Sequence, residues 1–241
     1  MAHLKRKALS GIRQPAKQMD LWLHKLFAME SDFLGHPLRG DRCIEYAYVV
    51  EKLSALPKEQ SVLDIGAADS SLTTITRVLG FNPVHGFDLM PSPIVFPGVA
   101  YFQGDFLDDT FTGQKLLPAY DIIVLCSTLE HFGLERYGSN KVTNADIRCV
   151  QKVKQLLKPG GHLLLTIPYG PEKIIFPYHR IYNKTGPLLN YLAQNLNMQE
   201  ERYHKNNEEN IWVSCSEEEA RKVKPAADNY ALGLFDFIKS S

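Results

Sequence analysis

Residues 62–71 read Val-Leu-Asp-Ile-Gly-Ala-Ala-Asp-Ser-Ser, a short apolar run that ends in a turn containing glycine. Gly66 stands where a sharp turn needs a residue without a Cβ atom, and the small residues Ala67 and Ala68 follow it. Such a turn lets a ligand approach the backbone. Further aliphatic runs follow, separated by segments of helical length. This alternation predicts an α/β fold built on a parallel sheet.

The pattern places further strands after this first one. We expect them at residues 84–87, 99–102, 121–125, 161–167, 198–203 and 231–238. The runs at 121–125 and 161–167 are apolar throughout, which is typical of strands buried on both faces. The pattern therefore predicts one three-layer domain with a seven-stranded sheet, in which all strands are parallel except for one near the C-terminal edge.

Helix signals mark the segments between the strands. Thr143, with Asp146 three residues later, resembles a capping box, and Lys158-Pro-Gly-Gly ends the helix that follows. We also expect a helix over residues 186–196 and a short one capped by Ser216. Apolar residues at helical spacing predict two earlier helices, at 19–27 and 46–53. We therefore predict an N-terminal helical extension over residues 1–57 and an α/β domain over 58–241.

Composition limits the partners and the location. Lys plus Arg number 27 and Asp plus Glu number 27, so no long-range field attracts a polyanion, and we expect no nucleic-acid partner. No apolar run approaches the ~20 residues of a membrane-spanning helix. The four cysteines form no C-x-x-C pair, which argues against a disulfide framework or a thiolate zinc site. These features predict a cytoplasmic protein and leave its oligomeric state open.

Acidic residues follow three successive strands. In an open parallel sheet, ligands bind beyond the carboxyl ends of the strands. Asp88, followed by Leu89, lies 22 residues beyond Gly66, where a carboxylate suits two ribose hydroxyls. Asp105 follows the third strand, beside Phe106. We expect Asp105 to accept from an exocyclic amine and an adenine ring to pack near Phe106.

Five motifs in this order resemble those of the class I S-adenosylmethionine-dependent methyltransferases, and the resemblance is close over residues 60–170. The motifs are Asp64-x-Gly66, Asp88, Asp105, Tyr120-Asp121 and Leu157-Lys-Pro-Gly-Gly161. The resemblance implies a Rossmann-like methyltransferase fold, S-adenosylmethionine as cofactor and methyl transfer as the activity. The family's Asp-x-Gly-x-Gly-x-Gly turn has Ala68 and Ser70 at its later glycine positions here. The cofactor-binding residues implied by the resemblance are Asp64, Gly66, Ala67, Asp88, Leu89, Asp105, Phe106 and Ser127.

The polar stretch after the fourth strand, residues 125–138, is the expected reacting end. Methyl transfer to a hydroxyl needs a base, and we assign that role to His131, with Glu130 holding the imidazole or the ligand's amine. The spacing Ser127-x-x-Glu130-His131 is also similar to the E-x-x-E-H motif of methyltransferases that bind a divalent metal. His179, the third candidate catalytic residue beside His131 and Glu130, would complete such a site. Because Ser127 replaces the first carboxylate, we assign no metal ligand and keep a divalent metal as a minority hypothesis for the cofactor.

The stretch around His131 and the segment Pro177-Tyr-His-Arg-Ile-Tyr182 resemble an uncharacterised bacterial group of these enzymes associated with surface-polysaccharide synthesis. This resemblance implies O-methylation of a sugar or another small polyhydroxylated acceptor. Residues 167–182 follow the fifth strand at the same end of the sheet and are rich in Tyr, His and Arg, so we expect them to form an acceptor lid. Arg39, Arg42 and Glu45, at the start of the second expected helix, are placed to close over the methionine end.

Two other functions are consistent with the sequence. The altered glycine turn also suits a methyltransferase-like scaffold that has lost catalysis. An NAD-dependent oxidoreductase is a weaker fit, because its G-x-G-x-x-G fingerprint would fall on Gly66, Ala68 and Ser71.

Overall fold

The computed structural model describes residues 40–68, 70–93, 96–116, 118–135, 141–208 and 211–240. Contacts divide the chain into residues 1–37 and 38–241, and the description below concerns the second unit. The helix expected at 19–27 lies outside the described residues. The second expected helix is α2 (Asp41–Ala55), which belongs to the second unit. The predicted division after residue 57 stays a prediction.

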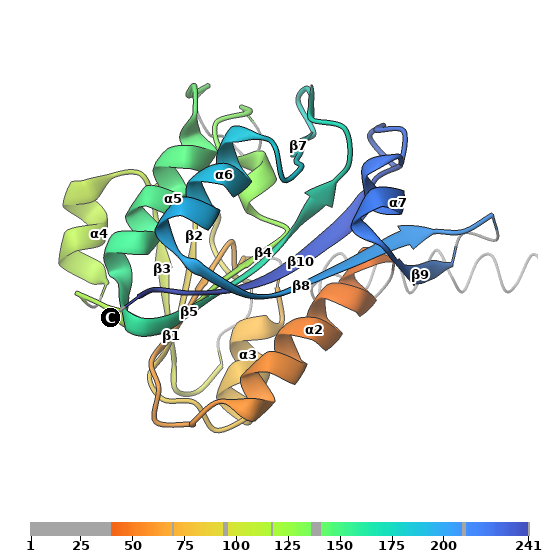
Figure 1. Cartoon of the computed structure of the whole chain (residues 1–241). Helices are drawn as coiled ribbons and strands as arrows, with labels where there is room; N and C mark the ends of the chain where they lie inside the picture. Colours follow the sequence, from red (N-terminus) through yellow and green to blue (C-terminus); the bar gives the residue numbers. More distant parts are fainter. Residues whose placement is uncertain are drawn as a thin grey trace, which may run out of the picture. The chain divides into compact units, whose positions relative to one another are not determined.

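Eight strands form the main sheet, in the spatial order β3-β2-β1-β4-β5-β10-β8-β9 (Figure 1). In chain order they are β1 (Val62–Ile65), β2 (Val84–Asp88), β3 (Val99–Gln103), β4 (Tyr120–Cys126), β5 (Leu157–Tyr169), β8 (Asn197–Asn206), β9 (Trp212–Cys215) and β10 (Ala231–Ile238). The first five run parallel, and β10 pairs antiparallel with both β5 and β8. The predicted fold class is confirmed.

The number of strands is a correction to the prediction. Seven of the eight strands coincide with the predicted runs, and β9 is the addition. It pairs antiparallel with β8 at the edge of the sheet. At four residues, with none fully buried, β9 is too short and too exposed to carry an apolar pattern that marks a strand.

Helices cover both faces of the sheet (Figure 1). α5 (Ala145–Leu156) and α6 (Pro187–Asn195) lie on one face, and α2 and α3 (Leu72–Val78) lie on the other. Alternate residues of β4 supply the two cores because successive side chains of a strand point to opposite faces. Ile123 packs in the cluster that contains Val150 of α5, and Ile122 in the cluster that contains Val49 of α2. Two shorter helices, α4 (Asp109–Lys115) and α7 (Glu217–Arg221), complete the described set.

The two predicted helix caps have different outcomes. Ser216 caps α7 through a complete capping box with Glu219, as expected. The box expected at Thr143 is wrong, because α5 begins after Asn144, whose backbone is left-handed (φ 55°) and whose side chain makes no capping hydrogen bond. A left-handed residue directs the chain into the helix differently from the extended N-cap that a capping box needs.

The strand order fixes where a ligand site belongs. The chain leaves β1 toward β2 on one side and later returns to β4 on the other, so β1 and β4 are the neighbours at which the order reverses. The β6–β7 hairpin (Lys173–Ile175 and His179–Ile181) occupies the segment expected to form a lid. Within the described residues, no helix has the length and apolar character needed to cross a membrane.

Candidate functional site

The turn after β1 requires glycine at position 66. Gly66 has φ +86°, a left-handed value that favours glycine, and a Cβ atom built there would lie 2.1 Å from Thr128 Oγ1. The N–H groups of Gly66 and Ala67 both donate to the carbonyl of Phe87 at the end of β2. The turn therefore packs against the β4 exit on one side and the β2 exit on the other.

Asp88 ends β2 and holds this turn. One oxygen of its carboxylate accepts from the Ala68 N–H at 2.9 Å, and the other accepts from the Met90 N–H at 2.8 Å. Leu89 follows and is half-buried. The structure thus brings Gly66, Ala67 and Asp88 together, as the sequence predicts.

Asp64 lies on β1 and is almost completely buried, at 2% exposure. Its Oδ2 atom has no hydrogen-bond partner among the described residues. Burial, followed by the nearby Asp88 carboxylate, raises the pKa of Asp64 to about 7, while the Arg42 guanidinium acts in the opposite direction. A buried carboxylate oxygen without a partner is suited to a cationic ligand, so the residues present fit a sulfonium cofactor.

The two residues at the end of β3 differ in their surroundings. Asp105 is exposed and accepts from the Leu107 N–H at 2.8 Å. Phe106 is buried, with its ring edge-on to Phe87 and Phe132 at 5.5 and 6.4 Å. Both lie at the same sheet edge as Asp88, because β3 pairs parallel with β2. Their predicted contacts with an adenine ring stay a prediction.

The chain leaves β4 through a strained residue, Ser127, with φ +45°. Its N–H donates to both the carbonyl and the hydroxyl oxygen of Thr166, and its hydroxyl donates to Glu45 Oε1. Left-handed backbone in a non-glycine residue persists only where the surroundings hold it. These hydrogen bonds therefore fix the direction of the 3-10 turn η1 (Leu129–His131) that follows.

Glu130, in η1, is fully buried, and its Oε2 atom has no hydrogen-bond partner among the described residues. Burial raises the pKa of Glu130 to about 8. Its other carboxylate oxygen lies 3.7 Å from His131 Nε2. At neutral pH most of this carboxyl is therefore protonated beside the imidazole.

His131 has a defined tautomer. Its Nδ1 atom lies 2.7 Å from the carbonyl oxygen of Tyr178. Because a carbonyl only accepts, Nδ1 carries the proton in this contact, and in the neutral imidazole the lone pair lies on Nε2. This is the arrangement that a general base needs.

His179 is placed differently from the other predicted catalytic residues. It lies on β7, is buried, and packs its ring edge-on against Tyr230 at 5.2 Å. The neighbouring Arg180 joins β7 to η1 by donating to the Phe132 carbonyl at 2.5 Å. Within the described residues, no group of three or more His, Cys, Asp or Glu side chains is arranged to hold a metal ion.

Helix α2 brings Arg42 and Glu45, which the sequence places at this end, together with Tyr46, which the sequence does not assign to the site. The Tyr46 hydroxyl donates to Ser70 Oγ and accepts from the Ser71 N–H. Arg42 donates to Glu45 and to the Cys126 carbonyl. Burial raises the pKa of Glu45, and the Arg42 guanidinium acts against that shift. In the sequence, Tyr46 is recognisable only as one of the regularly spaced apolar residues of a helix. That spacing does not reveal where its hydroxyl group points.

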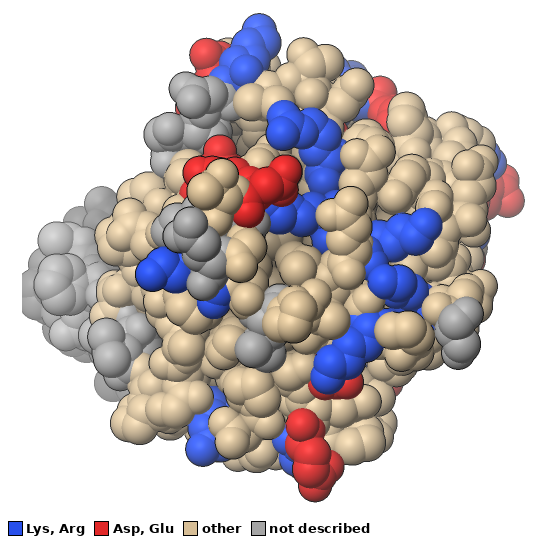
Figure 2. Space-filling view, turned by 90° about the vertical axis from the view of Figure 1, so that its left-hand side faces the viewer, with Lys and Arg blue, Asp and Glu red and all other residues tan. Residues whose placement is uncertain are grey.

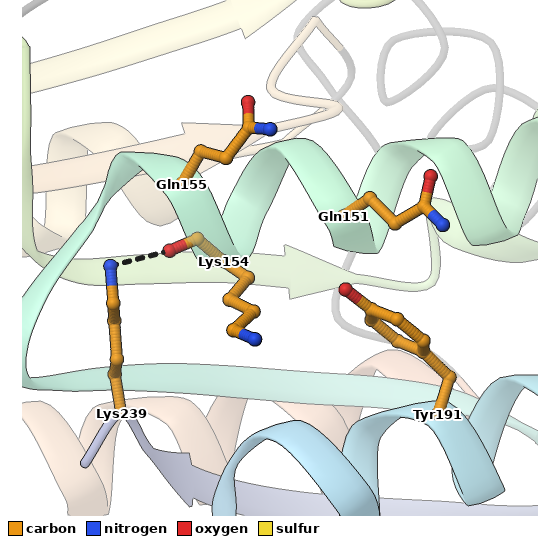
Figure 3. Close-up of a pocket in the computed structure, with 5 residues that line it drawn as sticks. All are labelled: Gln151, Lys154, Gln155, Tyr191 and Lys239. Atoms are coloured by element: carbon orange, nitrogen blue, oxygen red, sulfur yellow. Dashed lines mark hydrogen bonds between the residues drawn. The ribbon is translucent and has the colours of Figure 1, made fainter.

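A hollow elsewhere on the molecule is separate from this site (Figure 3). Its lining residues are Gln151, Lys154, Gln155, Tyr191 and Lys239. They come from the last half of α5, from α6 and from the residue after β10. Because α5 ends and β10 finishes at the amino-terminal edge of the parallel strands, the hollow lies at the opposite edge of the sheet from Gly66 and His131.

A family described as "Caenorhabditis protein of unknown function, DUF268" matches residues 107–229, just over half of the chain. The chain belongs to the DUF268 family. The matched region of this DUF268 protein begins after β3, ends just before β10 and includes Glu130, His131 and His179. Asp64, Gly66 and Asp88 precede it.

Curated relatives of the DUF268 protein are named ribosomal RNA large subunit methyltransferase E. The protein from Methanospirillum hungatei is 24% identical over 157 residues, which are 64% of this chain and 75% of that protein. The protein from Methanocorpusculum labreanum is 25% identical over 48% of this chain, and the match spans 57% of its own length.

Solved structures similar to the DUF268 protein share its fold. The N-methyltransferase NodS from Bradyrhizobium japonicum, in complex with S-adenosyl-L-homocysteine, matches with a TM-score of 0.54 at 16% identity over 82% of this chain and 87% of that one. A Burkholderia thailandensis 1,6-didemethyltoxoflavin-N1-methyltransferase matches with a TM-score of 0.50 at 14% identity over 80% and 78%. The DUF268 protein therefore has the Rossmann-like methyltransferase fold.

Replacing Asp88 by alanine in the DUF268 protein should weaken S-adenosylhomocysteine binding by about 1–3 kcal/mol, because the Ala68 and Met90 N–H groups lose their acceptor and the turn loses its support. Isothermal titration measures the change. Asp109→Ala is the control, since that carboxylate is 91% exposed and its ion pair with Lys152 lies at the surface. Equal affinity of the Asp88 variant and the wild type would remove Asp88 from the site.

The stability of the DUF268 protein should fall as pH rises through the titration of Asp64. The folded state raises the pKa of Asp64 from 3.8 to about 7, so within this window it binds a proton that the unfolded chain has lost. Between about pH 5 and pH 8 this group alone costs about 2–3 kcal/mol of stability. Urea unfolding at both pH values should show a smaller loss for Asp64→Asn than for the wild type. The same loss in both proteins contradicts the assignment.

Proposed function

We propose that this DUF268 protein is an S-adenosylmethionine-dependent methyltransferase that methylates a hydroxyl group of a sugar-like, polyhydroxylated acceptor. The named relatives and the structures with bound S-adenosylhomocysteine support the cofactor and the reaction class. One observation carries the proposal. A single edge of the sheet holds the Gly66 turn, supported by Asp88, and an imidazole whose proton is on Nδ1.

Asp64, Gly66 and Asp88 would hold the cofactor. When bound, S-adenosylmethionine supplies a methyl group on a positively charged sulfur. The buried Asp64 carboxylate, whose Oδ2 has no hydrogen-bond partner in the described part of the chain, favours a cation in its vicinity. The acceptor must then be deprotonated and aligned for in-line attack.

His131 would take the proton of the acceptor hydroxyl at Nε2. The Tyr178 carbonyl holds the imidazole in the required tautomer and stabilises the imidazolium that results, because it accepts from Nδ1 in both states. Glu130, largely protonated at neutral pH, places no full negative charge beside Nε2. In this tautomer Nε2 is the ring atom that can accept a proton.

The hydroxyl acceptor is favoured by the presence of a base and by the charge balance. An amine acceptor that is neutral before transfer needs less help from a base, whereas a hydroxyl must lose its proton. A polyhydroxylated acceptor carries no charge for the protein to match, in agreement with equal numbers of basic and acidic residues.

Ribosomal RNA is the second candidate acceptor, because the curated relatives are named for it. Figure 2 shows a band of Lys and Arg side chains across the face on the α4 side of the molecule, with acidic side chains beside it. Two basic residues of α5 and β5, Lys152 and Lys158, are paired with Asp109 and Asp121. This pairing offsets part of the positive charge that a polyanion would need.

Two measurements test the proposal. Titration with S-adenosylhomocysteine should show saturable binding, while NADH should not bind. A labelled-methyl transfer screen should then include nucleotide sugars, free glycans, small phenols and a ribosomal RNA fragment, with S-adenosylmethionine as donor. Transfer to a sugar hydroxyl is the expected result. Transfer to the RNA alone would replace the proposed acceptor, and no binding of S-adenosylhomocysteine would favour a scaffold.

A further inference from the structure

Helix α2 contacts both loops that flank the point where the strand order reverses. One loop follows β1 and leads into α3 through Ser70 and Ser71, and the other leaves β4 through Ser127. The two loops meet where Thr128 packs against Gly66. Any element that holds both loops therefore sets the geometry of the proposed cofactor turn and of η1.

Glu45 holds the loop after β4. Its carboxylate is completely buried and accepts from the hydroxyls of Ser127 and Thr166, the latter at 2.7 Å. Arg42 donates to the other oxygen of Glu45 at 3.1 Å and to the Cys126 carbonyl at 3.3 Å. Ser127 has a left-handed backbone, so this anchor keeps an unfavourable conformation in place.

Tyr46, the next residue of the helix, holds the other loop. Its hydroxyl donates to Ser70 Oγ at 3.0 Å and accepts from the Ser71 N–H at 3.2 Å. Adjacent residues of a helix point in directions about 100° apart, so two neighbouring side chains reach two different partners. One turn of α2 thereby spans both loops.

We propose that Glu45 and Tyr46 form a two-residue clamp that positions the cofactor turn and η1 relative to each other. In this role they are positioning residues, since their contacts are with the loops. The inference rests on the proposed function for its ligand, S-adenosylhomocysteine, and it also makes a prediction about the loops themselves. Loss of either side chain should loosen both loops while the sheet stays folded.

The chain offers two controls on the same helix. Tyr48 is as buried as Tyr46, and its hydroxyl has no hydrogen-bond partner among the described residues, so Tyr48→Phe removes a hydroxyl without removing a contact to a loop. Leu53 is fully buried in the core of the α2 face, so Leu53→Ala lowers stability without touching either loop.

The experiment titrates S-adenosylhomocysteine into the full chain and its variants, well below their unfolding temperatures. Glu45→Gln and Tyr46→Phe should each weaken binding about tenfold, whereas Tyr48→Phe and Leu53→Ala should bind like the wild type. The inference is overturned if both clamp variants bind as tightly as the wild type, or if Leu53→Ala weakens binding as much as they do.

Amide hydrogen exchange distinguishes failure of the clamp from failure of the proposed function. A wild type that does not bind S-adenosylhomocysteine contradicts the proposed cofactor, and exchange in residues 66–71 and 126–131 then tests the clamp alone. Faster exchange in both segments for Glu45→Gln and Tyr46→Phe, and not for Tyr48→Phe, supports the clamp. Unchanged exchange overturns it.

Discussion

Gly66→Ala should both destabilise the protein and abolish measurable binding of S-adenosylhomocysteine. An L-residue at φ +86° costs about 1–2 kcal/mol, and here the added Cβ atom would also lie 2.1–2.7 Å from three side-chain atoms of Thr128. The turn has to move away from the β4 exit to make room. Urea unfolding measures the first effect and isothermal titration measures the second.

Gly160 provides the matched control for this variant. It has a similar left-handed backbone, φ +75°, but a Cβ atom there would meet nothing within 4 Å. Gly160→Ala should therefore show the backbone cost alone and bind the ligand normally. Thr128→Ala removes two of the three overlapping atoms and should restore part of the loss in Gly66→Ala. Equal behaviour of the two glycine variants would show that close packing at the turn is unimportant.

His131→Ala should lower the rate of methyl transfer by about 10²–10⁴ while leaving the affinity for S-adenosylhomocysteine unchanged, because a positioned base contributes only to the chemical step. The acceptor found in the labelled-methyl screen is used at saturating concentration. A lower transfer rate with unchanged ligand affinity is the informative result, because loss of a packing role of the imidazole would lower both the rate and the affinity.

His204→Gln serves as the control for His131. This histidine lies on β8, near the far edge of the sheet from the Gly66 turn, and is half-buried. Its replacement should leave the transfer rate within about twofold of the wild type, the scale of a surface change. A His131 variant that retains full activity would assign deprotonation of the acceptor to another group.

The sequence predicted the layers of this fold because its signals were local. Apolar runs at 121–125 and 161–167 became β4 and β5, and Gly66 occupies the left-handed turn expected of it. One antiparallel strand near the C-terminal edge was also predicted, and the structure identifies it as β10. β9 was missed, because its four residues pair with β8 through backbone groups that any sequence supplies.

The contacts that build the site were harder to predict because they join distant segments. Glu45 and Thr166 are 121 residues apart in the chain. Tyr46 belongs to the helix that precedes β1 in the chain, and Ser70 belongs to the loop that follows β1. The Tyr178 carbonyl that fixes the His131 tautomer is a backbone atom, so no residue type reveals it. The functional roles of the candidate site residues, Asp105, Phe106 and His179 among them, remain predictions.

The position of β10 has a consequence for folding during synthesis of the protein. This strand comes after β8 and β9 in the chain, yet it lies between β5 and β8. Until residues 231–238 emerge from the ribosome, β5 and β8 each expose a row of unpaired backbone groups next to apolar side chains. Exposed edges of this kind recruit other strands and lead to aggregation. A nascent chain interrupted before residue 231 should therefore depend on chaperones to stay in solution.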